Sequence, residues 1–300
     1  MTAPYALILL TWNQWALTRD CLKRLGGLSR ERWAIWVVDN GSAEAPPLGF
    51  EALHPSLRLL RLAENLGFAG GCNRGAEAAF QAGASAAVFL NNDASTTPED
   101  LERLAGAVSQ GPWGIVGAVN YSASAPDKIF STGQRFVWAL CRLQRLTSLS
   151  PGETPQPVPG IVGSCFATSR KLFETVGLLD QRFFIYYEEA DLCVRAFRAG
   201  FRVGYHPQVK VLHEGLTSFG RQSPATLYLY TRNLGLFMSK QCPKMLLPFC
   251  LLSYGIQAFL KSVLLAVRGK REGACAVWAG VFDFLGGRYG GEPVKRFVRT

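Results

Sequence analysis

Four short apolar runs constrain the fold of this 300-residue chain more than any other feature. They cover residues 5–10, 34–38, 57–62 and 86–90. The first, second and fourth runs are continuously apolar rather than alternating, the third includes Arg58 and Arg61, and helical patterns follow the first and the third. Strands buried on both faces show this pattern, and strand–helix repeats at this spacing build parallel sheets. We therefore predict an α/β fold with a mostly parallel central sheet and helices on both faces.

A polar cluster follows every one of these runs, centred on Asn13, Asp39, Asn65 and Asp93. Turns alone would explain one or two such clusters. Four of them at the same edge of a parallel sheet instead predict a ligand site, because open α/β sheets bind ligands beyond the carboxyl ends of their strands. A carboxylate at the end of the second strand, Asp39, can accept hydrogen bonds from a base or ribose. The edge therefore predicts a nucleotide.

The fourth run ends in Asn91, Asn92 and Asp93, before a helix that begins near Pro98. A carboxylate held at the end of a stiff strand suits a divalent cation that bridges the phosphates of a nucleotide. The alternative is an Asn/Asp turn that caps the next helix.

Four glycines lie between the third run and the next helical segment, at positions 67, 70, 71 and 75. They would let the backbone approach a ligand, and the helix they open could offer N–H groups to anionic oxygens. Their spacing matches neither GxGxxG nor GxxxxGK[ST], which argues against a dinucleotide oxidoreductase and a P-loop ATPase. Close packing of the helix on the sheet is the alternative explanation.

A second acidic centre, Glu188, Glu189 and Asp191, follows an aromatic run and leads into a helix. Acids at a helix N-terminus are electrostatically favoured in any protein. Aromatic shielding would also raise a carboxylate pKa towards the range of a general base. A strand pair is predicted over residues 203–213, and His213 at its end is a candidate metal ligand.

The middle of the chain, residues 120–159, is rich in proline near its end and is predicted to be an irregular excursion over the site. Eight cysteines occur without a CxxC pair or histidine spacing, so we expect neither a zinc site nor disulfides. The N-terminus enters a strand directly, and we expect a reducing, cytoplasmic setting.

The basic charge lies mainly in the tail. Of 32 Lys and Arg and 22 Asp and Glu, 11 basic and 3 acidic residues follow residue 225. We expect a nucleotide-binding and catalytic domain over 1–225 and a basic, apolar helical region over 226–300. Within residues 245–267, Pro248 and Lys261 argue against a spanning helix. One or two amphipathic helices at an anionic membrane surface are favoured, and a soluble cap or homodimer interface is the alternative.

Six motifs together resemble glycosyltransferase family 2, of the GT-A fold, and most of all its rhamnosyltransferase-like branch. The resemblance covers roughly residues 5–240. The motifs are Thr11-Trp-Asn, Val38-Asp-Asn-Gly-Ser42, Asn65-Leu-Gly-Phe-Ala-Gly-Gly-Cys-Asn73, Leu90-Asn-Asn-Asp93, Phe183-Phe-Ile-Tyr-Tyr-Glu-Glu-Ala-Asp-Leu-Cys193 and His213-Glu-Gly-Leu-Thr-Ser218. The fold implied is a Rossmann-like GT-A domain followed by a C-terminal helical segment.

The resemblance assigns roles to single residues. Asp93 keeps the acid of the Asp-x-Asp metal motif, and His213 is a further ligand, so that Mg²⁺ or Mn²⁺ is expected. The nucleotide-sugar would contact Thr11, Asn13, Asp39, Asn65, Gly67, Asn73, Asn91 and Asn92. The family carries a Glu-Asp pair whose Asp is the usual general base. This pair falls on Glu188-Glu189, so a Glu stands where that Asp is expected. This departure leaves the base divided between Glu189, which we favour, Asp191 and Glu188.

The implied activity is inverting transfer of a sugar from dTDP-rhamnose or a UDP-sugar to a hydroxyl of a glycan or polyprenyl-linked acceptor in cell-surface polysaccharide synthesis. We expect the protein to be peripheral on the inner face of the cell membrane, with no nucleic-acid partner. A non-catalytic nucleotide-sugar-binding protein and a nucleotidyltransferase are the alternatives. The identities of the sugar, nucleotide and acceptor stay open.

Overall fold

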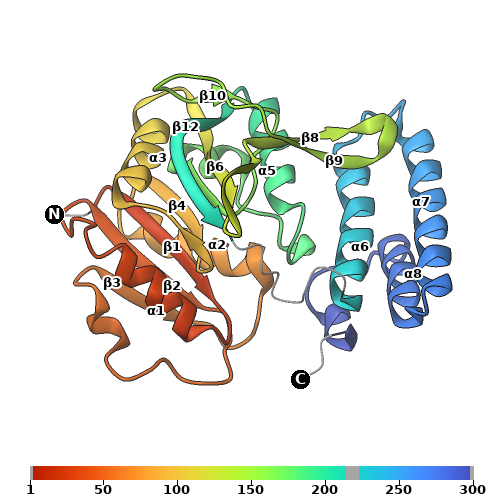
Figure 1. Cartoon of the computed structure of the whole chain (residues 1–300), viewed down its shortest axis with the longest axis horizontal. Coiled ribbons are helices and arrows are strands. Elements are labelled where there is room, and N and C mark those ends of the chain that lie inside the picture. Colours follow the sequence, from red (N-terminus) through yellow and green to blue (C-terminus); the bar gives the residue numbers. More distant parts are fainter. Residues whose placement is uncertain (1–2, 214–222, 298–300) are drawn as a thin grey trace.

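The computed structural model describes residues 3–213 and 223–297, and one mixed ten-stranded sheet runs through it (Figure 1). The main strand order is β10-β12-β6-β11-β4-β1-β2-β3, with β5 paired to β12 and β7 to β6. The strands of this sheet are β1 Tyr5–Thr11, β2 Trp33–Asp39, β3 Leu57–Arg61, β4 Ala86–Asn91, β5 Ala94–Ser95, β6 Trp113–Ser122, β7 Ala125–Ser131, β10 Gln156–Pro157, β11 Cys165–Ser169 and β12 Arg202–His213. The four predicted apolar runs are β1 to β4, and they pair in parallel. β5, β7, β10 and β11 pair antiparallel with their neighbours, and the other six strands run parallel to one another, so the sheet is mixed but mostly parallel.

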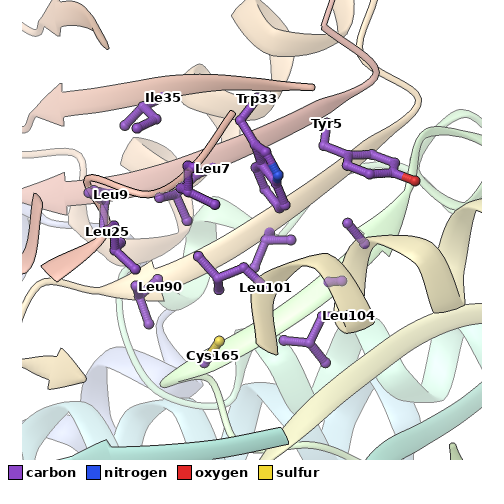
Figure 2. Close-up of a cluster of buried hydrophobic side chains, with 14 of the residues drawn as sticks. Tyr5, Leu7, Leu9, Leu25, Trp33, Ile35, Leu90, Leu101, Leu104 and Cys165 are labelled. Atoms are coloured by element: carbon purple, nitrogen blue, oxygen red, sulfur yellow. The ribbon is translucent and has the colours of Figure 1, made fainter. Parts of the chain in front are cut away.

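Helices cover both faces of the sheet. The helices are α1 Trp15–Arg24, α2 Gly67–Gln81, α3 Pro98–Gln110, α4 Arg170–Val176, α5 Glu188–Arg198, α6 Pro224–Gln241, α7 Leu247–Val267 and α8 Arg271–Leu285. α1 and α3 share one buried cluster with alternate residues of β1, including Leu7 and Leu9 (Figure 2). Ile8, between them, packs on the opposite face with α2, α4 and α5. Burial on both faces explains why the run is continuously apolar.

The glycine-rich segment is the first half of α2 rather than a loop. A Cβ at Gly71 would lie 2.3 Å from Leu10 Cδ1, and one at Gly75 would lie 2.7 Å from Ile8 Cγ2. Larger residues at these positions would push the helix off the sheet. Close packing, the alternative explanation of these glycines, is therefore what the structure shows at these two positions.

Two predictions for the middle of the chain are wrong. Residues 120–159 were expected to be irregular, yet they contain β7, β10 and a hairpin of β8 Gly133–Val137 and β9 Arg142–Leu146. The expected strand pair over 203–213 is one long strand, β12, with an irregularity between His206 and Lys210. In both segments pairing with distant strands, or packing on distant helices, fixes a backbone whose local pattern is weak.

The C-terminal helices α6, α7 and α8 pack together beside the sheet (Figure 1). The Tyr254 hydroxyl of α7 donates to the Thr231 carbonyl of α6 at 3.1 Å, and the Tyr228 hydroxyl of α6 donates to Asp283 of α8 at 2.7 Å. α7 buries one stripe, which is Cys250, Tyr254, Ala258, Ser262 and Leu265. Its other side is apolar and exposed. In length and composition it is the single helix of the described residues that could cross a membrane.

Candidate functional site

The carboxyl ends of the first strands meet at one edge, as predicted. Thr11 of β1 lies opposite Asp39 of β2, and Asp39 lies opposite Arg61 of β3. On the other side of β1, Leu10 lies opposite Asn91 of β4. The polar residues that follow these strands therefore share one edge of the sheet.

Asp39 and Asn13 organise the loops at this edge. The Asp39 carboxylate is fully buried, accepts the Ser42 amide at 2.9 Å and pairs with Arg61 Nε at 2.8 Å. Asn13 has a positive φ of 56° and joins the two loops, since its Oδ1 accepts the Ala43 amide at 2.9 Å. Thr11 Oγ1 is buried and has no hydrogen-bond partner among the described residues. The roles of Thr11, Asn13 and Asp39 towards a nucleoside stay predictions.

Asn40, which sequence reasoning missed, connects the second strand to the start of α2. Its Nδ2 donates to Asn65 Oδ1 at 2.9 Å and to the Gly67 carbonyl at 3.0 Å, and its Oδ1 accepts the Leu66 amide at 3.0 Å. Asn65 also accepts the Gly67 amide at 2.8 Å. Gly67 has φ +73°, and a Cβ there would lie 2.3 Å from the Phe184 carbonyl oxygen. This network sets where α2 begins, beside the segment that carries the acidic centre.

Two of the predicted donor-site asparagines use their side chains within the chain. Asn73 donates to the Leu179 carbonyl at 2.8 Å and accepts the Leu179 amide at 3.0 Å. Asn92 donates to Gln14 and Thr18 of the α1 region, at 3.3 and 3.1 Å. The structure gives both residues a packing role, and their contact with a donor stays a prediction.

The two predicted metal ligands come together from segments 120 residues apart. His213 Nε2 lies 3.2 Å from Asp93 Oδ1, and both side chains are largely buried. Antiparallel pairing of His213 with Ala94 holds them there, and Asn91 Nδ2 lies 3.5 Å from the same ring nitrogen. Residues 214–218 of the last motif lie outside the described residues.

This pair suits a divalent cation that a substrate helps to bind. Carboxylate oxygen and imidazole nitrogen both suit Mn²⁺, and Mg²⁺ is typically held by one or two carboxylates together with substrate phosphates and water. Within residues 3–213 and 223–297, no three His, Cys, Asp or Glu side chains form a metal-binding group. The residues therefore fit a cation shared with a diphosphate rather than a closed structural site.

A strained segment presents the second acidic centre. Phe184, Tyr186 and Tyr187 have φ values of 67°, 76° and 76°, which are costly for side chains with a Cβ. α5 begins directly after them with Glu188 and Glu189 in its first turn. Strain of this kind gathers at functional sites, where the surrounding structure imposes it.

The environments of Glu188 and Glu189 raise their pKa values. Burial is the main cause for both, and the neighbouring Glu189 carboxyl raises the pKa of Glu188 further. Glu189 Oε1 accepts a hydrogen bond from Gln134 Nε2 at 3.3 Å, whereas its Oε2 has no partner among the described residues. Glu189 also lies against Gly163, next to Ser164, whose carbonyl accepts the Asn91 amide at 2.9 Å. It therefore adjoins the strand end that leads to Asp93.

Asp191 is in a different situation. It is fully buried, and its oxygens lie 2.8 Å from Arg195 Nε, 2.6 Å from Lys240 Nζ and 2.6 Å from Gln241 Nε2. Two cations and an amide compensate this carboxylate and join α5 to α6.

Arg232 and Asn233 of α6 were also missed by sequence reasoning. Asn233 Nδ2 lies 2.8, 2.8 and 3.0 Å from the carbonyl oxygens of Phe183, Ile185 and Tyr186. Arg232 is fully buried and donates to the Phe183 carbonyl at 3.0 Å. An Arg-Asn pair inside an otherwise apolar helical pattern was the available signal. For Gln134 the sequence offered no such signal, because its segment was expected to be irregular.

Comparison with known proteins adds to this geometry. Residues 6–177 match the family described as "Glycosyl transferase family 2". The chain is 26% identical over 265 residues to the N-acetylglucosaminyl-diphospho-decaprenol L-rhamnosyltransferase of Mycobacterium tuberculosis, covering 80% of this chain and 85% of that protein. It is 26% identical over 243 residues to the low-salt glycan biosynthesis hexosyltransferase Agl10 of Haloferax volcanii, covering 78% and 75%.

Solved structures are similar in fold. The mannosyltransferase PcManGT from Pyrobaculum calidifontis, in complex with GDP-Man and Mn²⁺, matches with a TM-score of 0.57 at 16% identity, over 95% of this chain and 88% of that one. GalNAc-T7 with UDP, GalNAc and Mn²⁺ matches with a TM-score of 0.60 at 15% identity, over 77% and 47%. These likenesses confirm the predicted GT-A-like α/β fold with C-terminal helices.

Proposed function

Because the chain belongs to glycosyl transferase family 2, we propose that it transfers a sugar, with inversion, from a nucleotide-diphosphate-sugar to a hydroxyl of a glycan or lipid-linked acceptor. The observation that carries the proposal is Glu189, a carboxyl of raised pKa beside the strand end that leads to the Asp93–His213 pair. Its raised pKa brings it closer to the working range of a general base at neutral pH.

The structure favours Glu189 among the three candidate bases. Asp191 is compensated by Arg195 and Lys240, so protonation there would break two ion pairs. Glu188 is more deeply buried than Glu189, which is half-buried. In both residues Oε2 is buried and has no partner among the described residues, so Glu189 differs in how its Oε1 is held. Gln134 holds the other oxygen and so orients the carboxylate.

The proposed chemistry is a single displacement. Glu189 accepts the proton of the acceptor hydroxyl while that oxygen forms a bond to the anomeric carbon. The bond from the anomeric carbon to the nucleoside diphosphate breaks on the opposite face, and the diphosphate leaves with the electron pair. Asp93 and His213 would hold Mg²⁺ or Mn²⁺, which supplies positive charge for the departing diphosphate.

The names of the relatives guide the choice of substrates. A rhamnosyltransferase and a hexosyltransferase of glycan biosynthesis are among them. We accordingly propose dTDP-rhamnose or a UDP-sugar as donor and a polyprenyl-linked or glycan acceptor in cell-surface polysaccharide synthesis.

The exposed side of α7 supports contact with a membrane surface, and we propose that this is the inner face of the cell membrane. Phe249, Leu252 and Val267 are 72%, 66% and 80% exposed. The exposed basic residues Lys244, Lys261, Arg268 and Arg271 lie in or next to the same helix. We propose that α7 lies in the plane of the interface, because its buried stripe ties it to α6 and α8 along its length. A spanning α7 would have to leave these partners.

The test compares two isosteric variants. Glu189→Gln should keep donor binding within a few-fold and lower turnover at least about a hundredfold, the usual contribution of a general base. Asp191→Asn should chiefly lower thermal stability, because it leaves Arg195 and Lys240 without their carboxylate. An active Glu189→Gln and a folded but inactive Asp191→Asn would move the base to Asp191.

The products of the wild-type reaction also distinguish a glycosyltransferase from the two alternative functions. Release of a nucleoside diphosphate, dependent on acceptor, is expected. Release of diphosphate from a nucleoside triphosphate would identify a nucleotidyltransferase, and donor binding without turnover would identify a binding protein.

A further inference from the structure

A cavity of about 1070 Å³ runs beside α5, outside the sheet edge described above. Its wall includes Gln134, Phe136 and Trp138 of the β8 segment, Val194 and Phe197 of α5, and Phe237 of α6. Ala190, Val194 and Phe197 lie three and four residues apart, so the cavity follows one face of that helix. The wall is mostly aromatic and aliphatic, which suits an apolar ligand.

One end of this cavity reaches the candidate base. Gln134 lines the cavity and donates to Glu189 Oε1 at 3.3 Å. Ala190, the next residue after Glu189, lines it as well. Only the Gln134 side chain therefore separates a ligand in the cavity from the Glu189 carboxyl, which would take the acceptor proton.

The β8–β9 hairpin leads from this point to the exposed helix α7 (Figure 1). Phe136 and Trp138 follow Gln134 along the strand, with ring centroids 4.9 and 6.0 Å from that of Phe237. Beyond them, the Trp138 carbonyl lies 3.5 Å from Cys250 Sγ of α7, and the Leu140 carbonyl accepts Gln257 Nε2 at 3.1 Å. Leu140 is 49% exposed at this tip and adjoins α7, although none of the residues that line the cavity belongs to α7.

The charged side chains of the hairpin are all basic. Residues 133–146 contain three arginines, Arg135, Arg142 and Arg145, and no acidic residue. Arg135 lines the cavity directly after Gln134. The hairpin thus lines the cavity with the Gln134 amide and the Phe136 and Trp138 rings, while the exposed Arg135, whose Nε donates to Gln144 Oε1 at 3.0 Å, adds a cation at its surface. A lipid-linked sugar likewise combines a hydroxyl, a phosphate and a hydrocarbon chain.

We propose that this cavity binds the hydrocarbon chain of an isoprenoid-phosphate-linked acceptor, with Arg135 at the phosphate and the chain leaving towards α7. The proposal rests on the proposed function and specifies the class of its acceptor. Val194 and Phe136 would determine how much of the chain is enclosed.

Titration calorimetry with the full-length chain tests the cavity without needing turnover. The probes are geranyl diphosphate, farnesyl diphosphate and inorganic diphosphate. A buried CH₂ group contributes about fourfold in affinity (about 0.8 kcal/mol). The extra five-carbon unit of farnesyl diphosphate should therefore tighten binding at least about tenfold over geranyl diphosphate.

Val194→Trp should place an indole ring in the path of the chain and abolish this difference, and Val194→Phe should reduce it. Leu48→Trp adds an aromatic ring at a fully exposed site far along the chain and should leave it unchanged. Each variant is first checked for unaltered thermal unfolding and donor binding. Equal affinity of the wild type for the two isoprenoid probes would refute the proposal. So would a chain-length preference that survives in a folded Val194→Trp, because the chain would then bind elsewhere, such as on α7.

Transfer assays separate this proposal from the function on which it rests. With a short, water-soluble acceptor, Val194→Trp should retain wild-type turnover while the advantage of a long-chain acceptor disappears as a raised KM. No transfer by the wild type to either acceptor would count against the proposed function, whereas the calorimetric comparison would still decide the cavity.

Discussion

Replacing Asn233 by Leu should release the strained segment that presents Glu188 and Glu189. In the native protein one amide reaches three carbonyl oxygens of residues 183–186. The Phe183 carbonyl keeps Arg232 as a donor in the variant, but those of Ile185 and Tyr186 lose the amide. Loss of a hydrogen bond to a buried group costs about 1–3 kcal/mol, so two such losses cost about 2–6 kcal/mol. Ile185 and Tyr186 are half-buried and water can replace part of this, so we expect about 2–4 kcal/mol.

Loss of the Asn233 hydrogen bonds should also lower turnover. Each residue held at positive φ costs on the order of 1–3 kcal/mol, which is comparable with what Asn233 supplies. Without it the segment can relax and displace the carboxyls that follow, and we expect turnover to fall between about tenfold and a hundredfold with donor affinity nearly unchanged.

Urea unfolding and steady-state kinetics measure both effects. Asn233→Gln, which keeps the donors but is one methylene longer, should lie between Leu and the wild type. Gln257→Leu removes an exposed amide that also donates to a carbonyl, and its stability should stay within about 0.5 kcal/mol of the wild type. The reasoning fails if Asn233→Leu is as stable as this control, or if it loses stability but keeps full turnover.

Three further predictions follow from the site and the tail. Excess EDTA should abolish transfer and Mg²⁺ or Mn²⁺ should restore it, with Asp93→Asn losing most activity; undiminished turnover in EDTA would remove the metal from the mechanism. Burial, and then the Glu189 carboxyl, raises the pKa of Glu188, so its stabilising contribution is present at low pH and is lost as pH rises through the native pKa. Glu188→Gln should therefore stabilise the protein against urea more at pH 8 than at pH 4, and an equal effect at both would contradict that assignment. Leu252→Glu with Leu260→Glu should lower co-sedimentation with anionic vesicles at least several-fold, while Leu48→Glu should not; unchanged binding would place the membrane contact elsewhere.

Local pattern was sufficient for the elements whose signal repeats along the chain. The apolar runs predicted β1 to β4, and Thr97, whose side chain accepts the Asp100 amide, begins α3 where the Thr-Thr-Pro sequence indicated. The carboxyl ends of parallel strands lie at the same edge of a sheet. The sequence therefore also predicted that Asp39 and Asp93 would lie at one edge.

The sequence by itself determined the fold class, placed the polar residues at one edge of the sheet and supplied the three carboxyls that we propose as candidate bases. It could not choose among these three, because their roles depend on partners far along the chain: Gln134 beside Glu189, and Lys240 beside Asp191. It also left residues 120–159 irregular, since a hairpin with little alternating pattern is held by packing on α6 rather than by its own propensity. Only the tertiary structure decided the path of the hairpin and showed how the environments of the three carboxyls differ, because burial and hydrogen bonding between distant segments set both the pKa of a carboxyl and the path of a weak strand.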